Sequence, residues 1–177
     1  MNKIDLRHQL TDRHRAFLAD VLSLSPPDFL FAPPHKWTAG QQLEHIYRSV
    51  APVKWAFTLP KFVLRFLFGK ASRPSGDYET LVRKYQGKLA AGSKAPASFV
   101  PRSVAVAHKD KWSRKLSLAI QALNQNAERY SELELDLYRL PHPLLGKLTL
   151  REMLYFTIYH VEHHHKAVWK TLENAGK

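Results

Sequence analysis

The sequence contains no cysteine. This absence excludes disulfide bonds, catalysis by a thiolate and zinc sites with cysteine ligands, so a bound metal ion would need histidine, carboxylate or water ligands. No apolar run approaches the roughly 20 residues that span a membrane. The start of the chain, MNKIDLRHQLTDRHR, lacks the apolar core of a signal peptide. We therefore expect a cytoplasmic protein.

Signatures of nucleotide-binding and serine-hydrolase folds are missing as well. The sequence has no Gly-rich phosphate loop, no nucleophile elbow, no strong strand pattern and no internal repeat. It does have helical periodicity, and 45% of its 177 residues are hydrophobic, which is enough to bury a substantial core. We predict a single domain over residues 1–177.

Acidic residues are scarce in one part of the chain. Residues 61–115 hold thirteen Lys and Arg but three acidic residues, so this stretch supplies +10 of the formal net charge of +12. Such a stretch could attract nucleic acid, an anionic membrane surface or an anionic substrate. A solvated basic surface without a partner explains the excess equally well.

Apolar residues recur at helical spacing in four long stretches. They predict helices over residues 4–24, from Thr38 onward, over about 108–137 and over 149–172, which together favour a four-helix bundle. We expect His8 and His14 on the first helix to be solvated. The second and fourth helices begin with capping boxes, formed by Thr38 with Gln41 and by Thr149 with Glu152.

The stretch between the second and third predicted helices is irregular. Residues 60–107 contain four prolines and four glycines. Lys61–Phe68 is expected to pack on the bundle, with a monotopic membrane contact as the alternative, and residues 77–91 could form an amphipathic helix. A connection of this length often forms a lid or a specificity surface.

The fourth predicted helix carries a pair of histidines one turn apart. His160 and His164 lie one above the other, beside an apolar row that includes His165. Two such imidazoles can bind one transition-metal ion. The zinc-protease motif requires Glu directly after the first histidine, however, and Val161 stands there. From this spacing alone, a metal site and a His-rich polar face both remain open.

Three motifs in a fixed order suggest a family. WTAGQQLEHI (Trp37–Ile46), HPLLGKLT (His142–Thr149) and HVEHH (His160–His164) resemble motifs of the DinB/YfiT-like superfamily, and the resemblance covers nearly the whole chain. Its members are bacterial four-helix bundles thought to be metal-dependent enzymes. The resemblance implies an all-α, DinB-like four-helix bundle, here with a long basic insertion over about residues 60–107.

The same resemblance implies a metal site. Family members typically bind one divalent transition metal through three histidines, which correspond to His45, His160 and His164. Imidazole ligands suit zinc, nickel, manganese or iron. His163 would then orient a ligand or the substrate, His165 would either pack in the core or support a ligand, and His142 would be structural.

The function implied is that of a metal-dependent enzyme. The first expectation is a hydrolase that acts on a small molecule through metal-activated water. The alternatives are a metal-dependent thiol (S-)transferase and a non-enzymatic module that binds nucleic acid or a membrane through residues 61–115. No motif supplies a general base, because Glu44 points about 100° away from His45 on a helix. Family habit suggests a homodimer.

Overall fold

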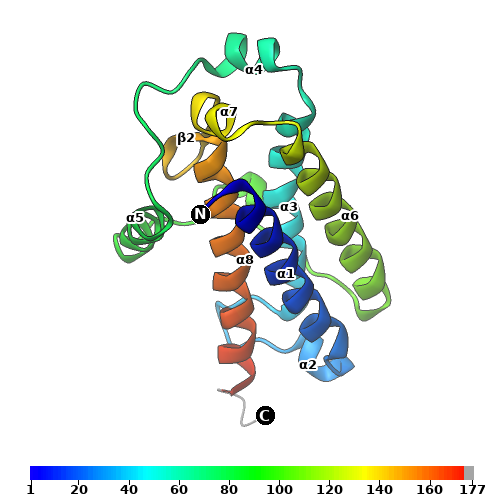
Figure 1. The fold of residues 1–177 in the computed structure, drawn as a ribbon. Helices are drawn as coiled ribbons and strands as arrows, with labels where there is room; N and C mark the ends of the chain where they lie inside the picture. The colour runs from blue at the N-terminus through cyan, green and yellow to red at the C-terminus, as the bar shows by residue number, and fades with distance from the viewer. Residues whose placement is uncertain (174–177) are drawn as a thin grey trace.

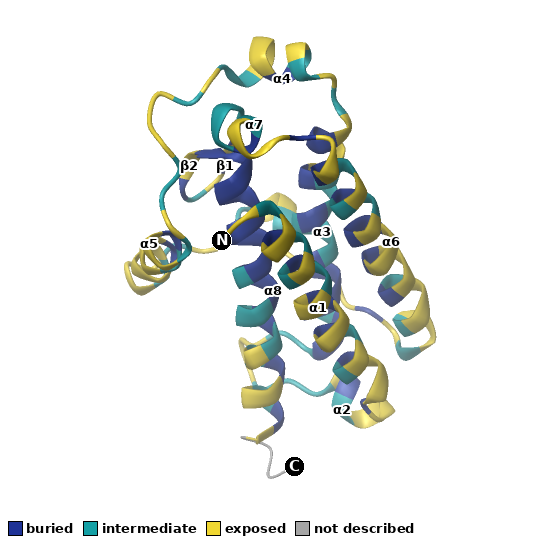
Figure 2. Cartoon of the chain, in the orientation of Figure 1, coloured by how far each residue is buried: buried dark blue, intermediate teal, exposed yellow. Residues whose placement is uncertain are grey.

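Four long helices form the body of the protein. The computed structural model describes residues 1–173. Helices α1 (Lys3–Ser23), α3 (Ala39–Thr58), α6 (Lys109–Glu128) and α8 (Leu150–Glu173) form a bundle (Figure 1), in which α3 and α1 pack on α6 and both also pack on α8. Their buried faces meet along the bundle axis (Figure 2). The predicted all-α four-helix bundle is confirmed.

Shorter elements connect the bundle helices. Helix α2 (Pro26–Leu30) follows the proline pair that ends α1. The chain between α3 and α6 forms α4 (Lys61–Phe68), α5 (Tyr78–Ala90) and the 3-10 turns η1 (Ala97–Phe99) and η2 (Val106–His108). The amphipathic helix predicted over 77–91 is thus present as α5, and the Asp77 side chain caps it by accepting from the Thr80 N–H. Within residues 1–173, every helix is too short or too polar to cross a bilayer.

The predicted third helix is two helices. Helix α6 ends at Glu128, and α7 (Glu132–Leu137) starts after Ser131. The reason is a third capping box, in which Ser131 accepts from the Glu134 N–H and Glu134 accepts from the Ser131 N–H. The apolar period continues across this break, which is why periodicity alone predicted one helix.

A small hairpin precedes the last helix, although the sequence has no strong strand pattern. Strands β1 (Arg139–His142) and β2 (Gly146–Thr149) pair antiparallel, with Arg139 opposite Thr149. Each strand has four residues, too few to show alternation in the sequence. His142 stabilises the turn because its Nδ1 accepts from the N–H groups of Leu144 and Leu145. The hairpin leads directly into α8, whose capping box of Thr149 and Glu152 is present as predicted.

The basic connection between α3 and α6 is tied to the bundle at two places. Arg73 and the Gly76 N–H both bind the buried Glu152 carboxylate at the start of α8. Farther along, the Arg102 N–H donates to Glu44 on α3. These contacts place the turn η1 against α3 and so help to form the cavity described next.

Candidate metal centre

Three histidines from two helices converge inside the bundle. His45 lies on α3, and His160 and His164 lie one turn apart on α8. The Nε2 atom of His160 is 3.2 Å from that of His45 and 3.0 Å from that of His164. All three side chains are buried. The structure thus brings together the three residues that the resemblance implied as ligands.

The outer nitrogens of two of these rings are fixed by hydrogen bonds. The Nδ1–H of His45 donates to the Phe99 carbonyl at 2.7 Å, and the Nδ1–H of His164 donates to the Gln42 side-chain oxygen. Because a neutral imidazole carries one N–H, each Nε2 of these two rings then has a free lone pair. Both lone pairs point at the His160 Nε2, which can donate to one of them at most.

This donor set fits a divalent transition metal. Metal-binding histidines usually donate their outer N–H to a carbonyl or carboxylate, as His45 and His164 do here. Tetrahedral ligands at about 2.0–2.1 Å from a zinc ion lie roughly 3.3 Å apart, close to the observed 3.0 and 3.2 Å between nitrogens. A cation bound by all three Nε2 atoms would also remove the repulsion between their facing lone pairs.

Burial keeps the three imidazoles neutral. Desolvation lowers the pKa of His45, and it lowers the pKa of His160 and His164 well below the usual value for histidine. The neutral form is the one that binds a metal ion, so protons compete weakly for these sites at neutral pH.

Aromatic rings enclose the cluster. The Trp37 ring lies 4.8 Å from the His45 ring and 6.0 Å from the His164 ring, between ring centroids. Phe156 stacks on His160 at 4.7 Å. Tyr85 on α5 meets His160 edge to face, and burial raises the pKa of Tyr85 to about 12, so its hydroxyl is protonated. These rings restrict access of water to the three nitrogens and hold the imidazoles in place.

The cluster lies on the wall of a cavity of about 660 Å³. The cavity lies between α3, α8 and the connection that carries α4, α5 and η1, and the hairpin closes one side. Its lining is mostly apolar, with Ser49, Lys94 and His163 among the polar exceptions. Among residues 1–173, no Asp or Glu lines it. The volume suits a small organic molecule.

Comparison with known families agrees with this geometry. A sequence model of the DinB superfamily matches residues 9–168. The chain belongs to the DinB superfamily. No curated protein and no solved structure matches it. Membership of the superfamily and the three-histidine cluster together fit a metal-dependent enzyme.

The remaining histidines of α8 separate into different environments in this DinB-superfamily protein. His163 lines the cavity, with its ring 5.1 Å from that of His164 and 6.1 Å from that of Tyr85. His165 points to α1, where its Nε2 lies 2.6 Å from the Asp20 carboxylate. Successive residues of a helix are rotated by about 100°, so the side chains of His163 and His165 cannot point in the same direction as that of His164. His165 therefore faces α1 rather than the cavity.

Two partners of the cluster were not predicted. The role of Gln42 could have been found, because it lies one turn before His45 on the same face of α3. The Phe99 carbonyl could not, because it is a backbone group 54 residues from His45. Glu44 points away from the cluster, as expected, and binds Arg48 and the Arg102 N–H.

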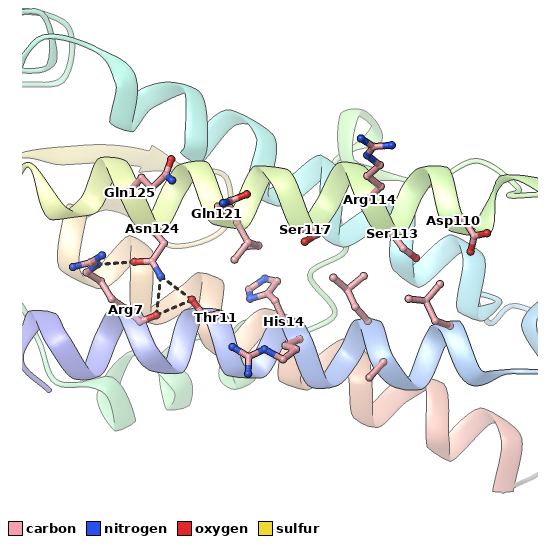
Figure 3. A pocket seen from close by; sticks show the side chains of 15 residues that line it. Arg7, Thr11, His14, Asp110, Ser113, Arg114, Ser117, Gln121, Asn124 and Gln125 are labelled. Atoms are coloured by element: carbon pink, nitrogen blue, oxygen red, sulfur yellow. Dashed lines mark hydrogen bonds between the residues drawn. The ribbon is translucent and has the colours of Figure 1, made fainter.

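A second hollow of about 740 Å³ lies between α1 and α6 (Figure 3). Hydrogen bonds among Arg7, Thr11 and Asn124 join the helices at one end, and the His14 ring faces the gap. The prediction that His14 is solvated is wrong, because the side chain is 1% exposed. It occupies a position of the apolar row, four residues after Leu10. Burial lowers the pKa of His14 to about 4.

This hollow lacks the features of the three-histidine cavity. The His14 Nδ1 binds the Leu10 carbonyl, and its Nε2 has no hydrogen-bond partner within residues 1–173. No second histidine or buried carboxylate lies beside it in the lining. We therefore take the cavity between α3 and α8 as the candidate functional site.

Proposed function

We propose that this DinB-superfamily protein is a metal-dependent hydrolase that acts on a small, largely apolar molecule. The observation that carries the proposal is the convergence of three Nε2 atoms, at 3.0 and 3.2 Å, on the wall of the 660 Å³ cavity. Three neutral imidazoles leave coordination positions free, which is typical of catalytic rather than structural sites.

His45, His160 and His164 would hold one divalent ion of zinc, nickel, manganese or iron. When bound, such an ion lowers the pKa of a coordinated water toward neutrality, which is the usual source of the nucleophile in metal-dependent hydrolysis. Other groups of the protein orient the metal-binding imidazoles. Gln42 and the Phe99 carbonyl fix two imidazoles through their Nδ1–H groups, so that both Nε2 atoms face the same point.

The other residues that line the cavity would recognise the substrate. Its apolar lining would bind the body of the substrate by removing apolar surface from water. His163 borders the cavity beside His164, and its ring nitrogens would hydrogen-bond a polar group of the substrate. Lys94 lies at the lining as well and would attract a carboxylate or phosphate on the substrate.

The test uses protein purified without a His-tag and reconstituted separately with each of the four metals. It is screened against ester, lactone, amide and thioester substrates with small apolar groups. We expect metal-dependent hydrolysis that His45→Ala abolishes. His163→Ala should retain the metal but raise KM or lower kcat. His165→Ala is the matched control, since its side chain pairs with Asp20 outside the cavity.

Two results would contradict the proposal. Hydrolysis that persists after metal removal would show that the three histidines do not support it. Turnover only in the presence of a low-molecular-weight thiol, with transfer of that thiol to the substrate, would assign the site to a thiol transferase instead.

A further inference from the structure

Helix α4 exposes large apolar side chains at one end of the bundle. Phe62, Phe66 and Leu67 are 75%, 87% and 52% exposed. The helix lies at the end of the molecule where the chain leaves α3 (Figure 1), and half of its residues are exposed (Figure 2). Leu64 is its one buried residue within the described chain. The face of α4 that carries Leu64 packs mainly on strand β1 of the hairpin.

The orientation of α4 follows from helix geometry. At 100° per residue, Phe62 and Phe66 lie within about 40° of each other and roughly 160–200° from Leu64. Leu64 anchors the helix, so the two phenyl rings must point away from the protein. The ends of α4 are held as well, by the Lys61–Glu134 ion pair at 2.6 Å and by the Arg139 Nε–H, which donates to the Phe68 carbonyl.

Cations flank this apolar face. Arg65 lies one residue before Phe66, and Lys70 follows Gly69, the C-cap residue of the helix. Both are exposed, and neither forms an ion pair with any acidic residue in the range 1–173. The acidic residues of neighbouring α7 are already bound, Glu134 by Lys61, and Glu132 and Asp136 by Arg151.

We propose that α4 docks the protein on an anionic lipid surface. Phe62 and Phe66 would enter the boundary between headgroups and acyl chains, while Arg65 and Lys70 contact lipid phosphates. A short helix with outward aromatic residues beside basic ones has the composition of an interfacial anchor. Each basic residue near such a surface adds to binding through the negative potential of the leaflet.

Other occupants fit this face less well. An eight-residue helix is about 12 Å long, so a contact between two copies through α4 would bury far less than the roughly 1,200 Å² of a stable interface. It would also bring Arg65 and Lys70 toward the same cations of the second copy. Single-stranded nucleic acid requires an extended groove with aromatic faces along it, whereas Phe62 and Phe66 share one face of a single eight-residue helix.

The test is vesicle flotation of the full-length protein at low salt. One vesicle set is pure phosphatidylcholine, and the other contains about one third phosphatidylglycerol to give a negative surface. We expect binding to the anionic vesicles that weakens as salt is raised. Phe62→Ser/Phe66→Ser should reduce the partition coefficient about tenfold or more, because two apolar side chains lose their burial in lipid.

The charge contribution is measured separately. Arg65→Gln/Lys70→Gln should reduce partition to the anionic vesicles about tenfold and flatten its salt dependence. Ile4→Ser/Leu118→Ser is the apolar control, because these side chains are 62% and 54% exposed on α1 and α6. Lys111→Gln/Arg114→Gln on α6 is the charge control. Both controls should bind vesicles like the wild type, and helicity should be unchanged throughout.

Several outcomes would overturn the proposal. One is a wild type that does not float with anionic vesicles, and another is a control pair that loses as much binding as the α4 pair. Loss of a dimer in Phe62→Ser/Phe66→Ser, with no vesicle binding by the wild type, would assign the face to a second copy. Binding of single-stranded DNA in place of vesicles would assign it to nucleic acid.

Discussion

Gln42 offers a direct way to weaken the three-histidine centre without touching a ligand. Its side-chain oxygen accepts the Nδ1–H of His164, and both residues are buried. Gln42→Met keeps the length and volume of the side chain but removes the acceptor. The His164 ring then loses the partner that fixes its tautomer and its direction, and the buried N–H is left unpaired.

The magnitude follows from the type of contact. Loss of a partner that orients a metal-binding histidine typically lowers metal affinity by about 10- to 100-fold, which corresponds to about 1.4–2.8 kcal/mol. The unpaired N–H should also lower the free energy of unfolding of the metal-free protein by about 1–3 kcal/mol. Gln42→Glu restores an acceptor, with a stronger hydrogen bond to an ionised group, and should retain the metal.

The assay is competition for zinc between the protein and a chelating dye, with the helical signal in circular dichroism as a check on the fold. Gln121→Met serves as the matched control, since Gln121 is exposed on α6. We expect the dissociation constant to rise in Gln42→Met alone. An unchanged constant in that variant, or an equal loss in Gln42→Glu, would refute the reasoning about His164.

Two further predictions concern stability. The pKa of His14 is about 4 in the fold against 6.5 for the free side chain, so the unfolded chain binds the proton more readily between these values. Stability contributed by neutral His14 is thus present above pH 6.5 and lost as pH falls toward 4. Between pH 7 and pH 5 the loss is about 2 kcal/mol, and His14→Gln should show a correspondingly smaller loss in urea denaturation. Separately, Glu152→Ala should cost about 2–3 kcal/mol, because Arg73 and two backbone N–H groups lose a buried acceptor. The control is Glu162, which is partly buried and pairs with the exposed Lys166, since Glu162→Ala should change stability by less than about 0.5 kcal/mol. A flat pH dependence common to both His14 forms, or equal effects at the two glutamates, would contradict these expectations.

The bundle helices could be predicted because each buries a regular apolar stripe. The boundary at Ser131 was missed because the stripe continues through it, although Ser131 and Glu134 do carry the spacing of a capping box. The hairpin before α8 was missed because its strands show no strand pattern in the sequence. Its turn is held instead by local hydrogen bonds from backbone N–H groups to His142. Periodicity reports burial over many residues and is insensitive to such short features.

The candidate site could be predicted only in part. Spacing on α8 paired His160 with His164, but the choice of His45 came from resemblance, since no local pattern links residues 115 positions apart. The cavity itself depends on the connection between α3 and α6, which folds back so that Phe99 meets His45. Tertiary contacts, such as the one between Glu44 and Arg102, hold Phe99 close to His45. No local sequence pattern predicts such contacts.

Elemental analysis of the untagged protein tests the central claim most directly, with wild type and His45→Ala prepared side by side. The three-histidine centre predicts one equivalent of a divalent transition metal in the wild type and its loss or marked weakening in the variant. This result would join α3 and α8 in one site. Absence of metal in the wild type, even after incubation with zinc, nickel, manganese and iron, would contradict the account and leave the buried histidines with a structural role.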